Sequence, residues 1–277
     1  MHYALRTIAR KIQRSLGQKG FSATAKRMLL KPWELTVGYL RACSPLARRC
    51  RREELEFDRQ RGIETAVHLD AGWMAKIQSA NWVHGIGYAP MPIRSARHIL
   101  ATLCIEYERY DFIDFGAGKG RMLFLAAEFP FRRIVGVEYS PDLYQTLQSN
   151  LTSYQSNNRR CGTMDAVLED ATRFALPLQP LVLFFHHPFE MPVFRQVMDL
   201  IERSLEEMPR EVVAVYYDPA CRELFDQSPF FRMVRQGPRD PSERYSSNWI
   251  VYATSPLPRG EVARYRAGEG TQHCQQQ

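Results

Sequence analysis

The central part of the chain alternates short apolar runs with amphipathic stretches. The runs are five or six residues long and rich in Val, Ile, Phe and Tyr, which is typical of buried strands. We predict strands at residues 110–115, 133–138, 166–171, 181–185, 212–217, 230–235 and 249–254. Helical spacing of apolar residues predicts helices at 53–61, 94–107, 122–129, 141–151, 192–208 and 219–226. This alternation predicts an α/β fold with a doubly wound sheet.

The first 52 residues follow a different pattern. Leu5, Ile8, Ile12 and Leu16 have the spacing of one helical face, and basic residues occupy the other face. This segment contains thirteen Lys or Arg and one acid, a net charge of +12, whereas the remainder of the chain carries −5. We therefore predict a basic amphipathic helical extension at 1–52, a folded domain at 53–256 and a disordered polar tail at 257–277.

The charge distribution limits the choice of partners. A basic amphipathic extension predicts peripheral contact with an anionic membrane or docking of a partner protein. A helix packed on the domain with its charges solvated fits equally well, and an Arg-rich start also mimics a mitochondrial presequence. Nucleic acid is disfavoured, because the folded domain is mildly acidic. No apolar run approaches the length of a membrane span.

The six cysteines are scattered along the chain. They form no C-x-x-C motif and have no histidine at ligand spacing, so the pattern indicates neither a zinc site nor a disulfide framework. We expect reduced thiols in a cytoplasmic protein and no bound metal.

The most informative stretch is DFGAGKGR, residues 114–121, which follows the first predicted strand. Its glycines are spaced two apart, at Gly116, Gly118 and Gly120. A dinucleotide fingerprint needs its third glycine one residue later, and a P-loop needs Ser or Thr directly after Lys119. The Asp114 carboxylate would repel a phosphate but suits an ammonium group. The turn thus favours S-adenosylmethionine, a nucleoside with an amino-acid tail and no phosphate; taken alone it also fits close helix–strand packing.

Acids recur at the ends of the next two predicted strands. Glu138 ends the second strand, where a carboxylate can accept hydrogen bonds from two ribose hydroxyls. Asp170 lies at the tip of the third, where it could accept from an adenine amino group. The alternative for each is an ordinary solvated acid, but a succession of three strand-end acids favours the ligand.

On these residues the sequence resembles the class I S-adenosylmethionine-dependent methyltransferases. DFGAGKGR resembles their first motif, VGVEYS their second, LEDA their third, and LVLFFHHPFE stands at their fourth-strand motif. FDxxxGIxT at 57–65 and GYxPxP at 87–92 resemble a bacterial branch of that family. The resemblance implies a Rossmann-like sheet of about seven strands, closed by an antiparallel pair. It also implies a set of cofactor-binding residues: Asp114, Gly116, Ala117, Gly118, Gly120, Glu138 and Asp170.

Two further residues are candidates for catalysis. Nitrogen methyltransferases of this family often carry Asn or Asp, then Pro and an aromatic residue, where this chain has His187-Pro188-Phe189. Neutral imidazole can accept the same hydrogen bond and can take a proton, although a structural strand-end histidine also fits. The resemblance also implies that Tyr88 lies in a loop over the methionine end of the cofactor; a surface aromatic is the alternative.

These observations predict a methyltransferase acting on a nitrogen nucleophile, with a protein amine or a small molecule favoured as the unidentified acceptor. The alternative is a non-catalytic S-adenosylmethionine-binding scaffold that docks a membrane or protein partner through residues 1–52. The replaced fourth-strand motif is the sequence feature that supports the scaffold. An NAD-dependent oxidoreductase is disfavoured by the glycine spacing.

Overall fold

A computed structural model describes residues 44–66, 88–243 and 245–255. The chain divides into two units, residues 1–50 and 51–277, and the account below concerns the second. The helices predicted in the first 43 residues and the tail predicted from residue 257 lie outside the described residues. Helix α2 (Pro45–Arg61) includes the predicted helix at 53–61 and begins earlier than expected. None of the described helices combines the length and the apolar character needed to cross a membrane.

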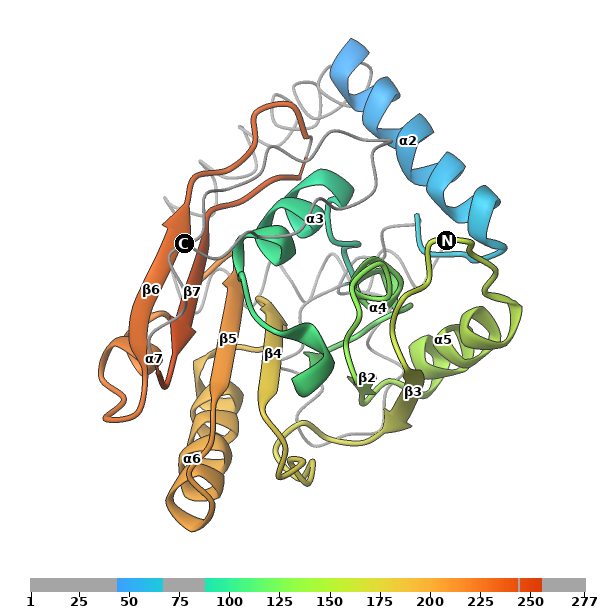
Figure 1. Cartoon of the computed structure of the whole chain (residues 1–277). Coiled ribbons are helices and arrows are strands. Elements are labelled where there is room, and N and C mark those ends of the chain that lie inside the picture. The colour runs from blue at the N-terminus through green and yellow to red at the C-terminus, as the bar shows by residue number, and fades with distance from the viewer. Residues whose placement is uncertain (1–43, 67–87, 244, 256–277) are drawn as a thin grey trace, which may run out of the picture. The chain divides into compact units, whose positions relative to one another are not determined.

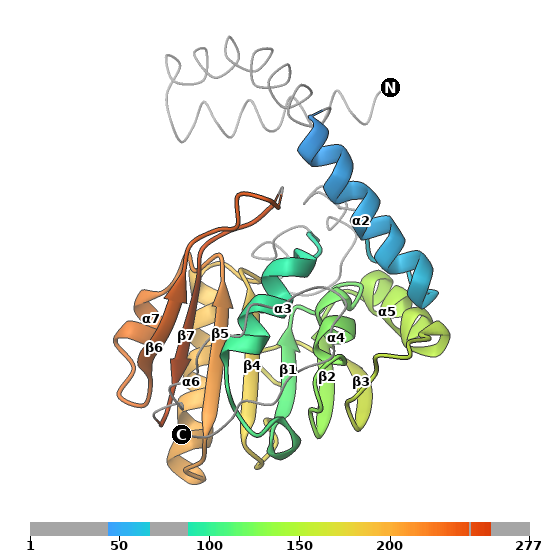
Figure 2. The same ribbon diagram turned by 45° about the horizontal axis from the view of Figure 1, so that its top comes forward.

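Seven strands form one mixed sheet in the order β3-β2-β1-β4-β5-β7-β6 (Figures 1 and 2). They are β1 (Asp111–Phe115), β2 (Arg133–Glu138), β3 (Thr163–Leu168), β4 (Leu181–His186), β5 (Val212–Tyr217), β6 (Arg232–Gly237) and β7 (Trp249–Ala253). The first five strands in that order pair in parallel, and β7 pairs antiparallel with both β5 and β6. The predicted Rossmann-like sheet and its closing antiparallel pair are thereby confirmed.

Helices cover both faces of the sheet (Figure 2). They are α3 (Ile93–Thr102), α4 (Arg121–Ala126), α5 (Pro141–Ser153), α6 (Met191–Glu207), α7 (Glu223–Asp226) and the short 3₁₀ helix η3 (Tyr107–Arg109). Side chains alternate along each strand: Phe112 and Phe184 pack with α3 and α4, whereas Ile113 and Phe185 pack with α6. The central strands are buried on both faces, which explains their continuously apolar sequences.

Several predicted boundaries were wrong: the helix predicted at 219–226 begins at Glu223, and the strand predicted at 230–235 is observed at Arg232–Gly237. The helix predicted at 94–107 ends at Thr102, because Cys104 adopts a left-handed φ of 50° that a helix cannot continue through. The helix after the glycine turn ends at Ala126. The third strand begins at Thr163, where its register with β2 starts, and ends at Leu168. Asp170 therefore lies beyond the strand and not at its tip.

The sheet order brings four strand ends together. Parallel strands β1, β2, β4 and β5 end at the same edge, and the order reverses between β1 and β4, which is where α/β proteins bind ligands. After β2 the chain enters α5, and Ser140 caps this helix, because its hydroxyl accepts a hydrogen bond from Leu143 N at 3.4 Å. This edge therefore gathers the glycine turn and the residues that follow β2, β4 and β5.

Candidate functional site

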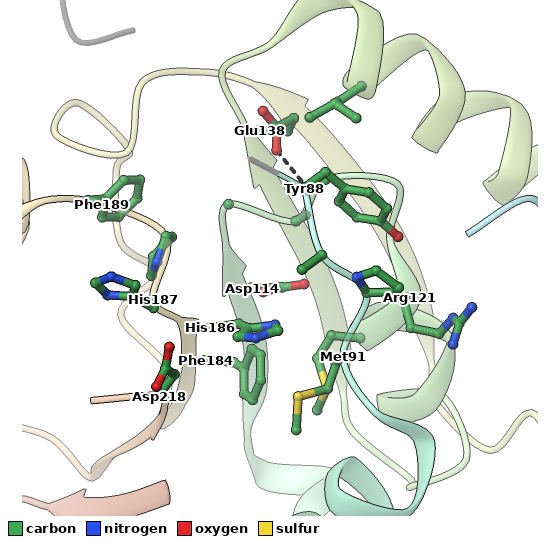
Figure 3. Close-up of a pocket in the computed structure, with 18 of the residues that line it drawn as sticks. Tyr88, Met91, Asp114, Arg121, Glu138, Phe184, His186, His187, Phe189 and Asp218 are labelled. Carbon is green, nitrogen blue, oxygen red and sulfur yellow. Dashed lines mark hydrogen bonds between the residues drawn. The ribbon is translucent and has the colours of Figure 1, made fainter. Parts of the chain in front are cut away.

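A pocket of about 180 Å³ lies at this edge of the sheet. Seven of the sequence-predicted site residues line it: Tyr88, Asp114, Gly116, Ala117, Gly118, Glu138 and His187. Gly120 and Asp170 are not among the lining residues. Figure 3 shows Glu138, Tyr88 and Arg121 on one side of the pocket, with His187 and Asp218 on the other. One pocket thus joins the glycine turn to the fourth-strand histidine.

The glycine turn needs its glycines for different reasons. Gly116 and Gly118 adopt φ values of 79° and 57°, which disfavour any side chain. A Cβ on Gly116 would lie 2.8 Å from the Cβ of Pro188, and one on Gly118 would overlap the Tyr88 ring. Gly120 instead caps α4, where a Cβ would overlap Leu147. Its role is helix packing, whereas Gly116 and Gly118 form the pocket wall.

Glu138 joins the end of β2 to the glycine turn. Its carboxylate accepts hydrogen bonds from Gly118 N at 2.7 Å and Ser140 N at 2.8 Å, and the residue is 3% exposed. Burial raises the pKa of Glu138 to about 7, although the two backbone donors oppose that rise. The carboxylate is therefore fixed at the pocket wall, where the sequence predicted contact with ribose hydroxyls.

Asp114 is the second buried acid of the pocket and is 4% exposed. Burial, reinforced by the neighbouring charge of Glu138, raises the pKa of Asp114 to about 8. No hydrogen bond from the described residues opposes this rise. The ligand-free pocket therefore contains two carboxylates that burial keeps partly protonated near neutral pH, and a cationic ligand would favour their ionised forms.

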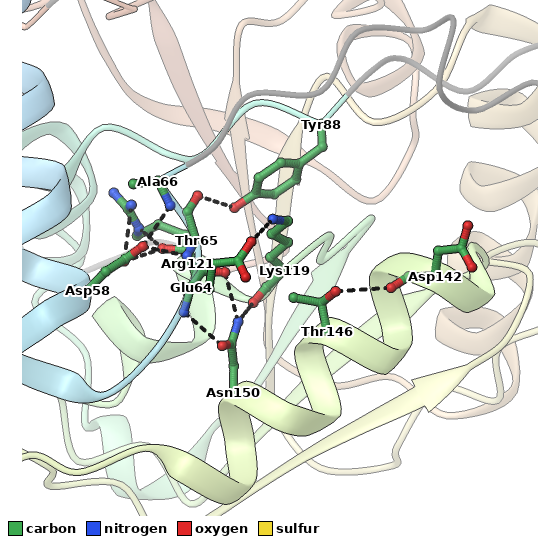
Figure 4. Close-up of polar contacts among 10 residues, drawn as sticks. All are labelled: Asp58, Glu64, Thr65, Ala66, Tyr88, Lys119, Arg121, Asp142, Thr146 and Asn150. Atoms are coloured by element: carbon green, nitrogen blue, oxygen red, sulfur yellow. Dashed lines mark hydrogen bonds and ion pairs between the residues drawn. The ribbon is translucent and has the colours of Figure 1, made fainter.

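The two cations of the turn point away from these acids. Lys119 Nζ forms an ion pair with Glu64, and the Arg121 guanidinium lies 3.3 Å from Asp58 and also donates to Thr65 Oγ1 (Figure 4). Arg121 is 1% exposed and lies over the Phe57 ring, with its Cζ 5.0 Å from the ring centroid. Neither charge is therefore directed at Asp114 or Glu138.

Asp58 fixes the backbone of residues 62–66, the segment that pairs with Lys119 and Arg121. Its carboxylate accepts hydrogen bonds from Thr65 N at 2.5 Å, Thr65 Oγ1 at 2.6 Å and Ala66 N at 2.7 Å. Gly62 makes the turn between Asp58 and Thr65 with a φ of 67°, and the Ile63 side chain packs in the core. This gives FDxxxGIxT a structural role: its Asp58 and Thr65 bind Arg121 of the glycine turn, and Glu64, at the unspecified position before Thr65, binds Lys119.

Tyr88 lies in the pocket wall, but its hydroxyl is directed out of it. The hydroxyl donates to Thr65 O at 2.8 Å, and burial raises the pKa of Tyr88 well above its usual value. The ring lies over Gly118. This geometry favours a packing role over the catalytic role suggested by the sequence.

Two strand ends carry an unusual backbone. His187 follows β4 and Asp218 follows β5; both adopt a left-handed φ, of 39° and 55°, and each is followed by a proline. Residues before proline favour extended conformations, so this backbone is strained, and such strain often marks functional sites. His187 Nδ1 is buried without a hydrogen-bond partner among the described residues.

The structure also revises the residue list. Asp170 binds its own loop, since its carboxylate accepts from Thr172 N at 3.0 Å and Thr172 Oγ1 at 2.8 Å. Its contact with adenine stays a prediction. Asp218 lines the pocket and was not identified from the sequence. Its signal was available, because Asp218-Pro219 follows an apolar strand just as His187-Pro188 does.

Comparisons with known proteins find similarity in structure only. No family model and no curated protein matches the sequence. Among solved structures, magnesium protoporphyrin IX methyltransferase from Synechocystis PCC 6803, solved with bound SAM, is 13% identical over 59% of this chain and 79% of that chain, with a TM-score of 0.41. The glycopeptide N-methyltransferase MtfA is 14% identical over 58% of this chain and 95% of its own, with a TM-score of 0.43.

A third similar structure is a SAM-dependent methyltransferase from Leishmania major. It is 14% identical over 58% of this chain and 70% of its own, with a TM-score of 0.43. Identities this low say nothing about substrate or activity, so function has to be inferred from the residues of the pocket.

Proposed function

We propose that this chain is an S-adenosylmethionine-dependent methyltransferase that acts on a nitrogen nucleophile. The observation that supports this most strongly is the arrangement of one pocket, in which the glycine turn lies between the buried acids Asp114 and Glu138. The basic residues of the turn are paired with Asp58 and Glu64, which leaves the pocket suited to a cation and not to a phosphate.

The residues present fit this cofactor. Asp114 would bind the ammonium group of the amino-acid tail, and Glu138 would accept from the ribose hydroxyls. Gly116 and Gly118 lack the side chains that would fill the cradle. When bound, S-adenosylmethionine supplies a methyl carbon whose bond to sulfur breaks with its electron pair on sulfur as the acceptor lone pair bonds to carbon.

His187 stands where an acceptor amine would approach. Attack needs a neutral amine, because an ammonium group has no lone pair. A neutral imidazole can accept the amine proton, and Pro188 restricts the backbone just after it. His187 lines the same pocket as Asp114 and Glu138, so an amine bound there could reach its imidazole.

Isothermal titration calorimetry tests the cofactor. S-adenosylhomocysteine should bind and NAD should not. Removing a charge-assisted hydrogen bond costs about 1.5–3 kcal/mol, so Glu138→Ala should weaken binding at least about tenfold. Glu206→Ala, on the exposed face of α6, is the matched control and should change nothing. Equal affinity in wild type and Glu138→Ala would remove the ribose assignment, and preferential binding of NAD would reject the cofactor.

The same proteins test the reaction with radiolabelled cofactor and a cell lysate fractionated by molecule class. His187→Ala should keep its affinity for S-adenosylhomocysteine and lose roughly a hundredfold in turnover, the low end for a positioned general base. His187→Asn should recover part of the loss if the imidazole orients the amine, and little if it removes the proton. Full turnover in His187→Ala would exclude the catalytic assignment, and binding without labelling of any class would support the scaffold.

A further inference from the structure

A second groove, of about 690 Å³, adjoins the cofactor pocket on the side of Asp218. It lies between the segment after β5 and the connection from β6 to β7. Its lining includes Asp218, Pro219, Arg222, Pro238, Ser247 and Trp249. Asp218 also lines the first pocket, so the two cavities meet at this side chain. Figure 3 places Asp218 and His187 together on the side of the pocket away from Glu138.

Asp218 is held in place by the neighbouring segment. Its backbone N–H donates to Asn248 O at 2.9 Å, and its Oδ1 accepts from the Ser247 hydroxyl at 2.6 Å. The other carboxylate oxygen has no hydrogen-bond partner among the described residues. The left-handed φ of 55° fixes the residue between β5 and Pro219. Asp218 therefore presents one unused acceptor oxygen where the two cavities meet.

The charges of the groove favour a cationic group at this oxygen. Asp218 is the one acid among the residues that line it. Arg222 also lines it, but its guanidinium is paired with Asp226 at 2.9 Å. Among the described residues that line the groove, Arg222 is the only basic one and this ion pair compensates it, so the Asp218 carboxylate is the uncompensated charge of that described lining.

Part of the groove wall is apolar. Pro219 and Pro238 contribute ring faces, and Trp249 packs against Gly237, where a Cβ would overlap the indole. Strands β5 and β7 are neighbours, so this wall lies about one strand spacing, roughly 4.8 Å, from the end of β5. A ring-sized apolar body could therefore rest on this wall while a group attached to it reaches Asp218.

We propose that this groove binds the methyl acceptor and that Asp218 binds the acceptor amine. The acceptor class is a primary or secondary amine carried on an apolar, ring-sized body. The identification of the occupant as the methyl acceptor rests on the proposed function; the binding of an amine at Asp218 does not. Asp218 acts as a positioning residue that holds the nitrogen between the groove and the cofactor pocket.

Benzylamine is a suitable probe, because it combines a ring with a single ammonium group. The full chain is titrated with benzylamine in the presence of S-adenosylhomocysteine, and binding is monitored by ligand-observed NMR. Benzylamine should bind saturably, whereas benzoate should not bind. Asp218→Asn should weaken benzylamine binding by about tenfold or more, as expected for loss of a charge-assisted contact. Asparagine tolerates a left-handed φ, so this variant should fold.

Asp165→Asn provides the matched control, since Asp165 is an exposed acid on β3, away from both cavities. It should leave the affinity for both ligands unchanged. Unchanged benzylamine affinity in Asp218→Asn, or tighter binding of benzoate, would overturn the inference. Failure of wild type to bind S-adenosylhomocysteine would instead reject the proposed function, and benzylamine would still report on the groove.

Discussion

The raised pKa values of Asp114 and Glu138 make a quantitative prediction about cofactor affinity. Burial raises these pKa values to about 8 and about 7 in the ligand-free protein. A ligand with an ammonium group and ribose hydroxyls needs both carboxylates ionised, so binding must release the protons that they carry. Affinity for S-adenosylhomocysteine should therefore rise with pH across the range in which these groups titrate.

The size of the effect follows from the ionised fractions. At about pH 6 roughly one Asp114 in a hundred and one Glu138 in ten would be ionised, each tenfold deficit costing about 1.4 kcal/mol. At about pH 8 about half of Asp114 and most of Glu138 would be ionised. Affinity should thus increase by roughly several hundredfold over this interval. The gain should level off above about pH 8, where both carboxylates become largely ionised.

Calorimetry in two buffers of different ionisation enthalpy measures both the affinity and the number of protons released. At about pH 6 wild type should release between about one and two protons per ligand bound. Asp114→Asn should bind more weakly and depend on pH only about tenfold, because Glu138 alone still titrates. A flat affinity profile, or net uptake of protons, would refute the assignment of the two carboxylates to the ligand.

Two further predictions concern the pocket wall at Gly118 and the buried ion pair between Asp58 and Arg121. Gly118→Ala should abolish S-adenosylhomocysteine binding in calorimetry, because a left-handed alanine costs roughly 1–2 kcal/mol and its Cβ displaces the Tyr88 ring. The double variant Gly118→Ala, Tyr88→Ala should recover part of the lost affinity. Normal binding by Gly118→Ala would show instead that the Tyr88 ring moves freely. Asp58→Asn should lower the free energy of unfolding in urea by about 3–5 kcal/mol, since it leaves the buried Arg121 charge uncompensated. Glu56→Gln, which removes an exposed ion pair with Arg59, should cost much less, and equal costs for the two variants would exclude a stabilising role for the Asp58–Arg121 pair.

The predictability of the fold varied with the position of each strand in the sheet. Strands β2 and β5 were predicted at their observed bounds, because they are buried on both faces and read as continuous apolar runs. Strand β3 lies at the edge, and its exposed and half-buried residues give a weaker pattern, so its start was misplaced. The error carried over to Asp170, which was assigned to a strand tip and lies in a turn instead.

The site was predictable where its residues are adjacent in the sequence. Asp114, the glycine turn and Glu138 lie on consecutive strands, so their meeting follows from the fold. Asp218-Pro219 repeats the pattern of His187-Pro188, but Asp218 was missed because the sequence does not show that β5 pairs beside β4. The binding of Arg121 by Asp58 was equally invisible, since these residues are 63 positions apart and meet only through tertiary packing.

These distant contacts decide the character of the pocket. The sequence DFGAGKGR contains two bases beside Asp114, the acid from which an ammonium-bearing ligand was predicted. In the folded chain both bases are paired, Lys119 with Glu64 and Arg121 with Asp58, so Arg121 lines the cavity with its charge compensated whereas Asp114 has no ion-pair partner among the described residues. Glu138 then adds a second acid from the neighbouring strand. The preference for a cationic group, predicted from Asp114, is therefore reinforced by the tertiary structure, in which Asp58 and Glu64 compensate the neighbouring bases.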